Sequence, residues 1–126
     1  MRDNREQWPS ELRLRETGRI LSVSFENGDS YDLSAEYLRV MSPSAEVQGH
    51  RREERLIIGG KRHCSVTGIE PVGTYAVRLI FDDLHSTGIF TWDYLHELGS
   101  RHDEKWAVYE AELKAKGLSR DRAGQA

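Results

Sequence analysis

The sequence predicts an α+β domain of two antiparallel β-meanders, with short helices packed on them and an amphipathic helix near the C-terminus. In several short segments, apolar residues alternate with polar ones, and turn-forming residues separate these segments, as is typical of antiparallel strands. Two of the segments run directly into a Ser or Thr that can cap a helix. The chain has 126 residues, of which 37% are hydrophobic, so we expect one domain with a modest core.

Residues 73–99 carry the clearest pattern. Four apolar residues fall on one face of an extended chain at period two: Tyr75, Val77, Leu79 and Phe81. A polar turn follows at residues 82–85, and residues 87–90 run back. Thr91 can cap a helix, and Gly99 can end it.

The first third of the chain predicts the other meander. Leu12 and Leu14 mark a first strand, a turn follows at residues 16–18, and residues 20–25 form the second strand. The Asn27-Gly28 pair predicts a hairpin with a two-residue type I′ turn, because that turn needs positive φ at both positions. Tyr31 and Leu33 continue on the returning strand.

Ser34 can cap a short helix over residues 35–40, which Pro43 ends because it disfavours helical geometry in the residue before it. Residues 44–55 have no clear period and are expected to form a loop. Strand character resumes at residues 65–70. The last helix begins near Asp103 and packs through a narrow stripe of Trp106, Tyr109 and Leu113, and Gly117 can end it.

The two meanders share an order of features. Each runs from a strand ending in Phe through a polar turn and a second strand to a Ser or Thr cap, and then to a Tyr-Leu pair at residues 37–38 or 94–95. One hypothesis is that two meander-plus-helix units pack together. The alternative is chance, since a hairpin followed by a helix is common.

The net charge, the cysteine count and the organisation of the chain limit the classes of function that we expect. We expect a flexible arm over residues 1–10, a single domain over 11–117 and a polar tail over 118–126. The net charge of −3 gives no general case for binding nucleic acid or an anionic membrane. The start lacks the apolar segment of a secretory signal, and the single cysteine, Cys64, excludes an internal disulfide. We therefore expect a cytoplasmic protein that binds no membrane.

The chain offers few residues for metal or catalytic chemistry. The candidate metal ligands are His85, Asp82, Asp83, His50 and Cys64, but no pair of cysteines has the spacing of a zinc site, so we expect no metal. His63 adjoins Cys64 but would face the other way in a strand, so the thiol has no evident base. No catalytic residue is predicted.

A basic cluster between Arg51 and Arg62 leaves two interpretations open. It contains Arg51, Arg52, Arg55, Lys61 and Arg62, interrupted by Glu53 and Glu54. One interpretation is a solvated loop, and the other is a contact with an anion or RNA.

Several separated motifs resemble a known family. They are WPSEL at residues 8–12, LRV at 38–40, SPSAEVQGH at 42–50, GIEPVGTYAV at 68–77, FDD at 81–83 and TWDYL at 91–95. In this order they resemble the small bacterial domain related to the N-terminal domain of gamma-butyrobetaine hydroxylase, also called domain of unknown function 971. The resemblance covers residues 8–120, and it implies that residues 11–117 form this domain in a stand-alone form.

The resemblance implies a lost zinc site. In the eukaryotic hydroxylases this domain holds zinc through three cysteines and a histidine, and the matching positions here are Ser42, Ser44, Val47 and His85. Hydroxyl groups are poor zinc ligands, so we expect no zinc of that kind. The 2-oxoglutarate oxygenase domain of those hydroxylases is absent from this chain, so the resemblance carries over no oxygenase activity.

The first functional interpretation is therefore a non-catalytic protein-interaction or accessory module with an unidentified protein partner. Its expected contact surface is the loop at residues 42–55 together with the turn at 82–85. The alternative is an accessory protein that binds zinc or iron through His85, Asp82 or Asp83 with His50 or Cys64. Related domains are fused to P-loop ATPases with iron–sulfur clusters, so that alternative includes a role beside iron–sulfur assembly.

Overall fold

The first sheet is an antiparallel meander near the N-terminus. The structure is a computed structural model, and the residues that it describes are 8–43, 59–83 and 88–121. Strands β1 (Pro9–Arg15), β2 (Ile20–Phe25) and β3 (Ser30–Ser34) pair in the order β1-β2-β3, and a 3-10 turn, η1 (Glu16–Gly18), joins the first two.

The second sheet repeats this arrangement later in the chain. Strands β4 (Val66–Val72), β5 (Ala76–Phe81) and β6 (Ile89–Thr91) pair antiparallel in the order β4-β5-β6. The described helices are α1 (Ala35–Val40), α3 (Trp92–Ser100) and α4 (His102–Ala115). The predicted α+β class, with two meanders and a C-terminal helix, is confirmed.

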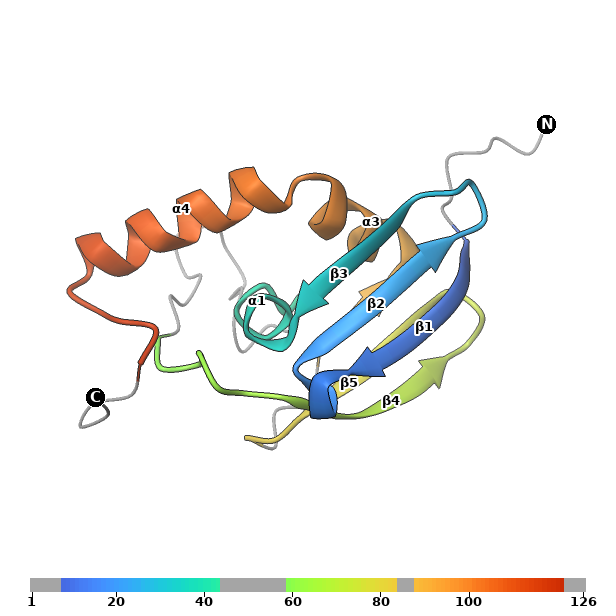
Figure 1. Ribbon diagram of the computed structural model, residues 1–126, viewed down its shortest axis with the longest axis horizontal. Coiled ribbons are helices and arrows are strands. Elements are labelled where there is room, and N and C mark those ends of the chain that lie inside the picture. Colours follow the sequence, from blue (N-terminus) through green and yellow to red (C-terminus); the bar gives the residue numbers. More distant parts are fainter. Residues whose placement is uncertain (1–7, 44–58, 84–87, 122–126) are drawn as a thin grey trace.

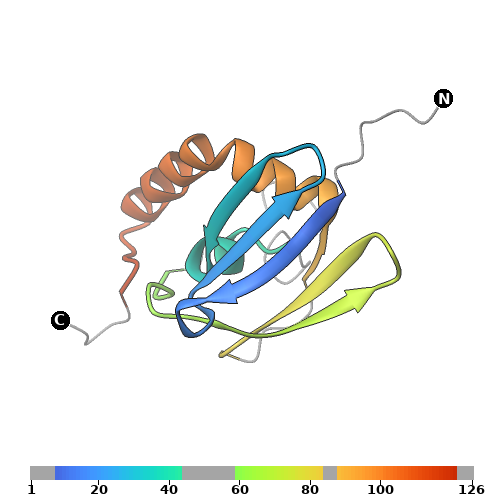
Figure 2. The ribbon, with the colours of Figure 1, turned by 45° about the vertical axis from the view of Figure 1, so that its right-hand side comes forward.

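The core lies between the two sheets and helices α1 and α3. The sheets lie one behind the other in Figure 1, and α4 extends beyond them on one side in both views (Figures 1 and 2). Alternate side chains of β2 and β5 are almost fully buried, as period-two patterning requires: Leu21, Val23, Phe25, Val77, Leu79 and Phe81. None of the described helices is both long and apolar enough to cross a lipid bilayer.

Two reciprocal hydrogen bonds join the meanders. The Ser34 hydroxyl accepts from the backbone N–H of Tyr37, and Thr91 does the same for Tyr94, each at 3.1 Å, so both caps form as predicted. The Tyr37 hydroxyl then donates to the carbonyl of Leu98 in α3 at 2.7 Å, and the Tyr94 hydroxyl donates to the carbonyl of Met41 after α1 at 2.5 Å. Each unit thus satisfies a carbonyl at the end of the other unit's helix.

Two local predictions need correction. The hairpin after β2 is not a type I′ turn, because Gly28 has a φ of 99° while Asn27 does not have a positive φ. Instead the N–H of Phe25 bonds the carbonyl of Asp29, and the Asn27 side chain accepts from the N–H of Asp29, which gives a three-residue loop. Gly99 does not end α3. The helix runs to Ser100, and the ring of Tyr31 packs so closely on Gly99 that an added Cβ would lie 2.4 Å from it.

The C-terminal segment after α4 packs against residues 59–62. The N–H of Gly60 donates to the carbonyl of Ser119 at 2.9 Å, and the N–H of Arg62 donates to the carbonyl of Arg120 at 3.0 Å. The backbones approach so closely that a Cβ on Gly59 would lie 2.6 Å from the Ser119 oxygen. Residues 118–121, which the sequence assigns to a polar tail, thus lie against the domain.

We expect Gly18→Ala to destabilise the protein more than Gly28→Ala. Both glycines have positive φ (87° and 99°). Either substitution therefore forces an alanine into the left-handed region, which costs about 1–2 kcal/mol of stability. Only at Gly18 would the new Cβ clash, at 2.2 Å from the Val66 carbonyl oxygen, where the first meander meets β4. Urea denaturation should show an extra loss of about 1–3 kcal/mol for Gly18→Ala. Equal losses would contradict this contact between the sheets.

Candidate functional site

The structure describes part of the predicted site. Ser44, Val47, His50 and His85 lie outside the described residues, as do Arg51, Arg52 and Arg55 of the basic cluster. The other predicted positions are Ser42, Cys64, Asp82 and Asp83, which are described. Among the described parts of the chain, no three His, Cys, Asp or Glu side chains come together in a way that could hold a metal ion.

Asp83 lies in a network with two cations. Its Oδ2 accepts from Arg39 Nε at 2.9 Å and from Lys61 Nζ at 2.5 Å. The Arg39 side chain is only 11% exposed, and its buried Nη1 makes no hydrogen bond to any residue that the structure describes. Asp82 accepts from the hydroxyl of Ser65 at 3.1 Å. Asp83 therefore serves first to neutralise cations that α1 and the 59–62 segment bring together.

Cys64 is held as a neutral thiol. It is 8% exposed, and burial raises its pKa to about 12, with a smaller contribution from the nearby charges of Asp82 and Asp83. The thiolate is the form that attacks substrates and binds metals, so the described surroundings of Cys64 suppress both activities. The neighbouring His63 is exposed and contacts Arg19.

Ser42 connects the two segments expected to form the contact surface. Its side chain is fully buried, and its Oγ lies so close to Gly88 that an added Cβ there would be 2.2 Å away. Pro43 also packs on Gly88, with Cδ 3.4 Å from the same position. The chain that enters the 44–58 segment thus lies against the chain that leaves residues 84–87.

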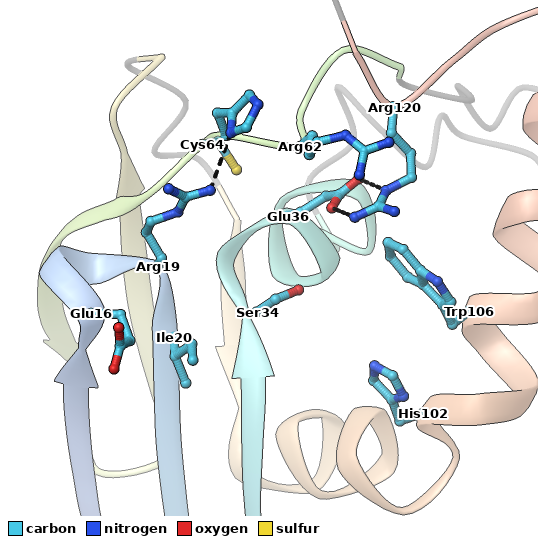
Figure 3. A pocket seen from close by; sticks show the side chains of 11 residues that line it. Glu16, Arg19, Ile20, Ser34, Glu36, Arg62, Cys64, His102, Trp106 and Arg120 are labelled. Atoms are coloured by element: carbon cyan, nitrogen blue, oxygen red, sulfur yellow. Dashed lines mark hydrogen bonds and ion pairs between the residues drawn. The ribbon is translucent and has the colours of Figure 1, made fainter.

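A second site, the Arg120 cleft, was not predicted. It is a hollow of about 530 Å³ over the start of α1 (Figure 3). Eleven residues line it: Glu16, Arg19, Ile20, Ser34, Glu36, Arg62, His63, Cys64, His102, Trp106 and Arg120. They come from the β1–β2 turn, the start of β2, the end of β3, the start of α1, the segment before β4, helix α4 and the C-terminal segment.

An ion pair between a buried carboxylate and a partly exposed guanidinium forms one side of the cleft. Glu36, in the first turn of α1, is 4% exposed, so its charge needs a partner. Arg120 supplies it, with Nε donating to Oε2 and Nη2 donating to Oε1, both at 2.7 Å. The two parallel bonds to Glu36 raise the pKa of Arg120 above its ordinary value.

Aromatic rings form the wall beside this pair. The Arg120 guanidinium lies 5.2 Å from the centre of the Trp106 ring, within the range of a cation–π contact. The His102 ring lies nearly parallel to Trp106, with centres 6.2 Å apart, and meets Tyr37 edge-on at 4.6 Å. The buried Tyr37 therefore helps to fix the ring wall.

Two more guanidinium groups line the cleft. Arg62 Nε donates to Asp121 at 2.5 Å. Arg19 pairs with no carboxylate of the described chain, and its Nη2 contacts Nδ1 of His63 at 3.2 Å (Figure 3). Because a guanidinium can only donate, Nδ1 of His63 is the acceptor in this contact.

The Ser42–Gly88 contact can be tested by a double-mutant cycle. We expect Gly88→Ala to cost about 1–3 kcal/mol, because the new methyl group overlaps Ser42 Oγ. Ser42→Ala removes that oxygen, so the cost of Gly88→Ala should fall by about 0.5–3 kcal/mol in its presence. Urea denaturation of the four proteins measures this coupling. Strict additivity would show that the two segments do not meet here.

Comparisons with known proteins give the family. The family model "Gamma-butyrobetaine hydroxylase-like, N-terminal" matches residues 12–96. A search of curated proteins finds no match.

Solved structures share the fold over most of the chain. Two solution structures determined by NMR are 46% and 38% identical to this chain, both with a TM-score of 0.79. The first match covers 96% of this chain and 98% of the solved chain. The second match covers 100% of this chain and 97% of the solved chain. A crystal structure from Acidithiobacillus ferrooxidans, of a protein with unknown function in the DUF971 family, is 42% identical, with a TM-score of 0.61 over 76% of this chain and 96% of its own. The chain therefore belongs to the family of gamma-butyrobetaine hydroxylase-like N-terminal domains.

Proposed function

We propose that the protein is a non-catalytic module that binds a protein partner. The observation that carries this proposal is that three carboxylates of the two described sites already have hydrogen-bond partners within the protein. Glu36 is held by Arg120, Asp83 by Arg39 and Lys61, and Asp82 by Ser65. A general acid or base must reach a proton of its substrate, and carboxylates already bonded within the protein are poorly placed for that task.

The contact surface we propose surrounds the junction of Ser42 and Gly88. Two chain segments leave the core there side by side, and the Arg39–Asp83–Lys61 network lies at their base. Binding sites are commonly built on loops that a rigid scaffold holds in place. Asp82, directly after the end of β5, would present its carboxylate at the edge of this surface.

The alternative function that the sequence suggests is that of an accessory protein that binds zinc or iron. Of its predicted ligands only Asp82, Asp83 and Cys64 are described, and the Cys64 thiol is protonated at neutral pH. Nothing in the described residues favours this alternative over the first. Elemental analysis of untagged protein separates them, since about one equivalent of zinc or iron would favour the accessory role.

Site-specific photo-crosslinking in cells tests the proposed surface. A photoreactive residue at the exposed position Asp82 should give a discrete adduct with one protein, because that position lies at the edge of the proposed contact. The matched control is the same residue at Glu104, which is exposed on α4 and belongs to neither described site. If position 82 gives no adduct, or the same adducts as position 104, the proposed surface is wrong.

A further inference from the structure

We propose that the Arg120 cleft binds a small flat organic anion, meaning a ring that carries a carboxylate or a phosphate group. This proposal goes beyond the protein-binding surface, because none of Ser42, Gly88 or Asp83 lines the cleft. The juxtaposition that carries it is an aromatic wall on one side and incompletely used guanidinium groups on the other (Figure 3).

The charged groups of the cleft leave donors for an anion. Both carboxylate oxygens of Glu36 are occupied by Arg120, and Glu16 makes no ion pair with Arg19 in the described structure. Arg62 uses only Nε, on Asp121, so its two terminal nitrogens make no bond to any described residue. A guanidinium has five N–H groups in a planar fork that matches carboxylate and phosphate geometry.

Arg19 strengthens the case for a negatively charged ligand. Its described partner is Nδ1 of His63 and not a carboxylate, so Arg19 has no direct ion pair in the described structure, although the carboxylate of Glu16 also lines the cleft. The other cations are balanced, Arg120 by Glu36 and Arg62 by Asp121. An anion that accepts from Arg19 and from the terminal nitrogens of Arg62 would satisfy both.

The opposite side of the cleft suits a flat ring. Trp106 and His102 present parallel ring systems there, and Ile20 adds apolar surface on the side of Arg19 (Figure 3). Trp106 is held by Arg120, and His102 is held by Tyr37, so little side-chain freedom is lost when a ligand packs on them. The volume of about 530 Å³ lies in the range of pockets that hold small organic ligands.

Titration by ¹H–¹⁵N NMR with four probes tests the ligand class. Adenosine 5′-monophosphate and benzoate each combine a ring with an anionic group, whereas adenosine has only the ring and inorganic phosphate only the charge. We expect the two combined probes to shift the Arg19 and Arg62 backbone signals and the Trp106 indole signal in a saturable way. Adenosine and phosphate alone should bind at least about tenfold more weakly than the monophosphate, because each lacks one of the two contacts.

Three variants locate the binding. Arg19→Gln and Arg62→Gln should each weaken the binding of adenosine monophosphate by about tenfold, since each loses a charge-assisted contact. Arg78→Gln is the matched control, because Arg78 lies on β5, pairs with Glu70 and is not part of the cleft. Arg19 is exposed, so its variant is expected to fold, which the dispersion of its NMR spectrum will show.

The proposal is overturned if neither combined probe gives saturable shifts up to about 10 mM, which corresponds to negligible affinity. It is also overturned if the Arg19→Gln and Arg62→Gln variants bind as well as Arg78→Gln, because the anion would then lie elsewhere.

Discussion

Two hydroxyl groups hold the halves of this domain together. Tyr37 donates to a carbonyl of α3, and Tyr94 donates to the carbonyl that follows α1, so each meander-plus-helix unit completes the hydrogen bonding of the other. The two tyrosines occupy equivalent positions, because each lies three residues after the helix cap of its unit, Ser34 or Thr91. A carbonyl buried without a partner is costly, and this cost fixes how the two units pack. Both described sites depend on that packing.

The Arg120 cleft is built on this frame by a segment distant in the sequence. The ring of Tyr37 contacts the ring of His102. Glu36, which precedes Tyr37, binds Arg120 and so holds the C-terminal segment against the start of α1. Arg120 in turn lies over Trp106. One turn of α1 thus positions the ring wall and the Glu36–Arg120 ion pair together, and two backbone hydrogen bonds to Gly60 and Arg62 hold the segment against the domain.

The sequence predicted the elements well, because strand alternation, Ser and Thr caps and polar turns are local rules. The hairpin type was wrong, since the Asn27 side chain stabilises a three-residue loop through Asp29, an interaction that the Asn-Gly pair alone does not reveal. The Arg120 cleft could not be predicted, because Glu36 and Arg120 are separated by 84 positions and no sequence pattern links them. The only available signals were an acidic residue in the first turn of a short apolar helix and a Trp on α4.

The most direct test of the central claim is the stability of three Tyr→Phe variants measured by urea denaturation. Tyr37→Phe should cost about 1–3 kcal/mol, because the carbonyl of Leu98 is left buried without its donor, and Tyr94→Phe should cost about 1 kcal/mol. Tyr75→Phe is the control, because Tyr75 is 54% exposed and its hydroxyl bonds no described residue. Its free energy of unfolding should therefore change by no more than about 0.5 kcal/mol. If Tyr37→Phe and Tyr94→Phe also stay within that range, the reciprocal bonds do not hold the two units together.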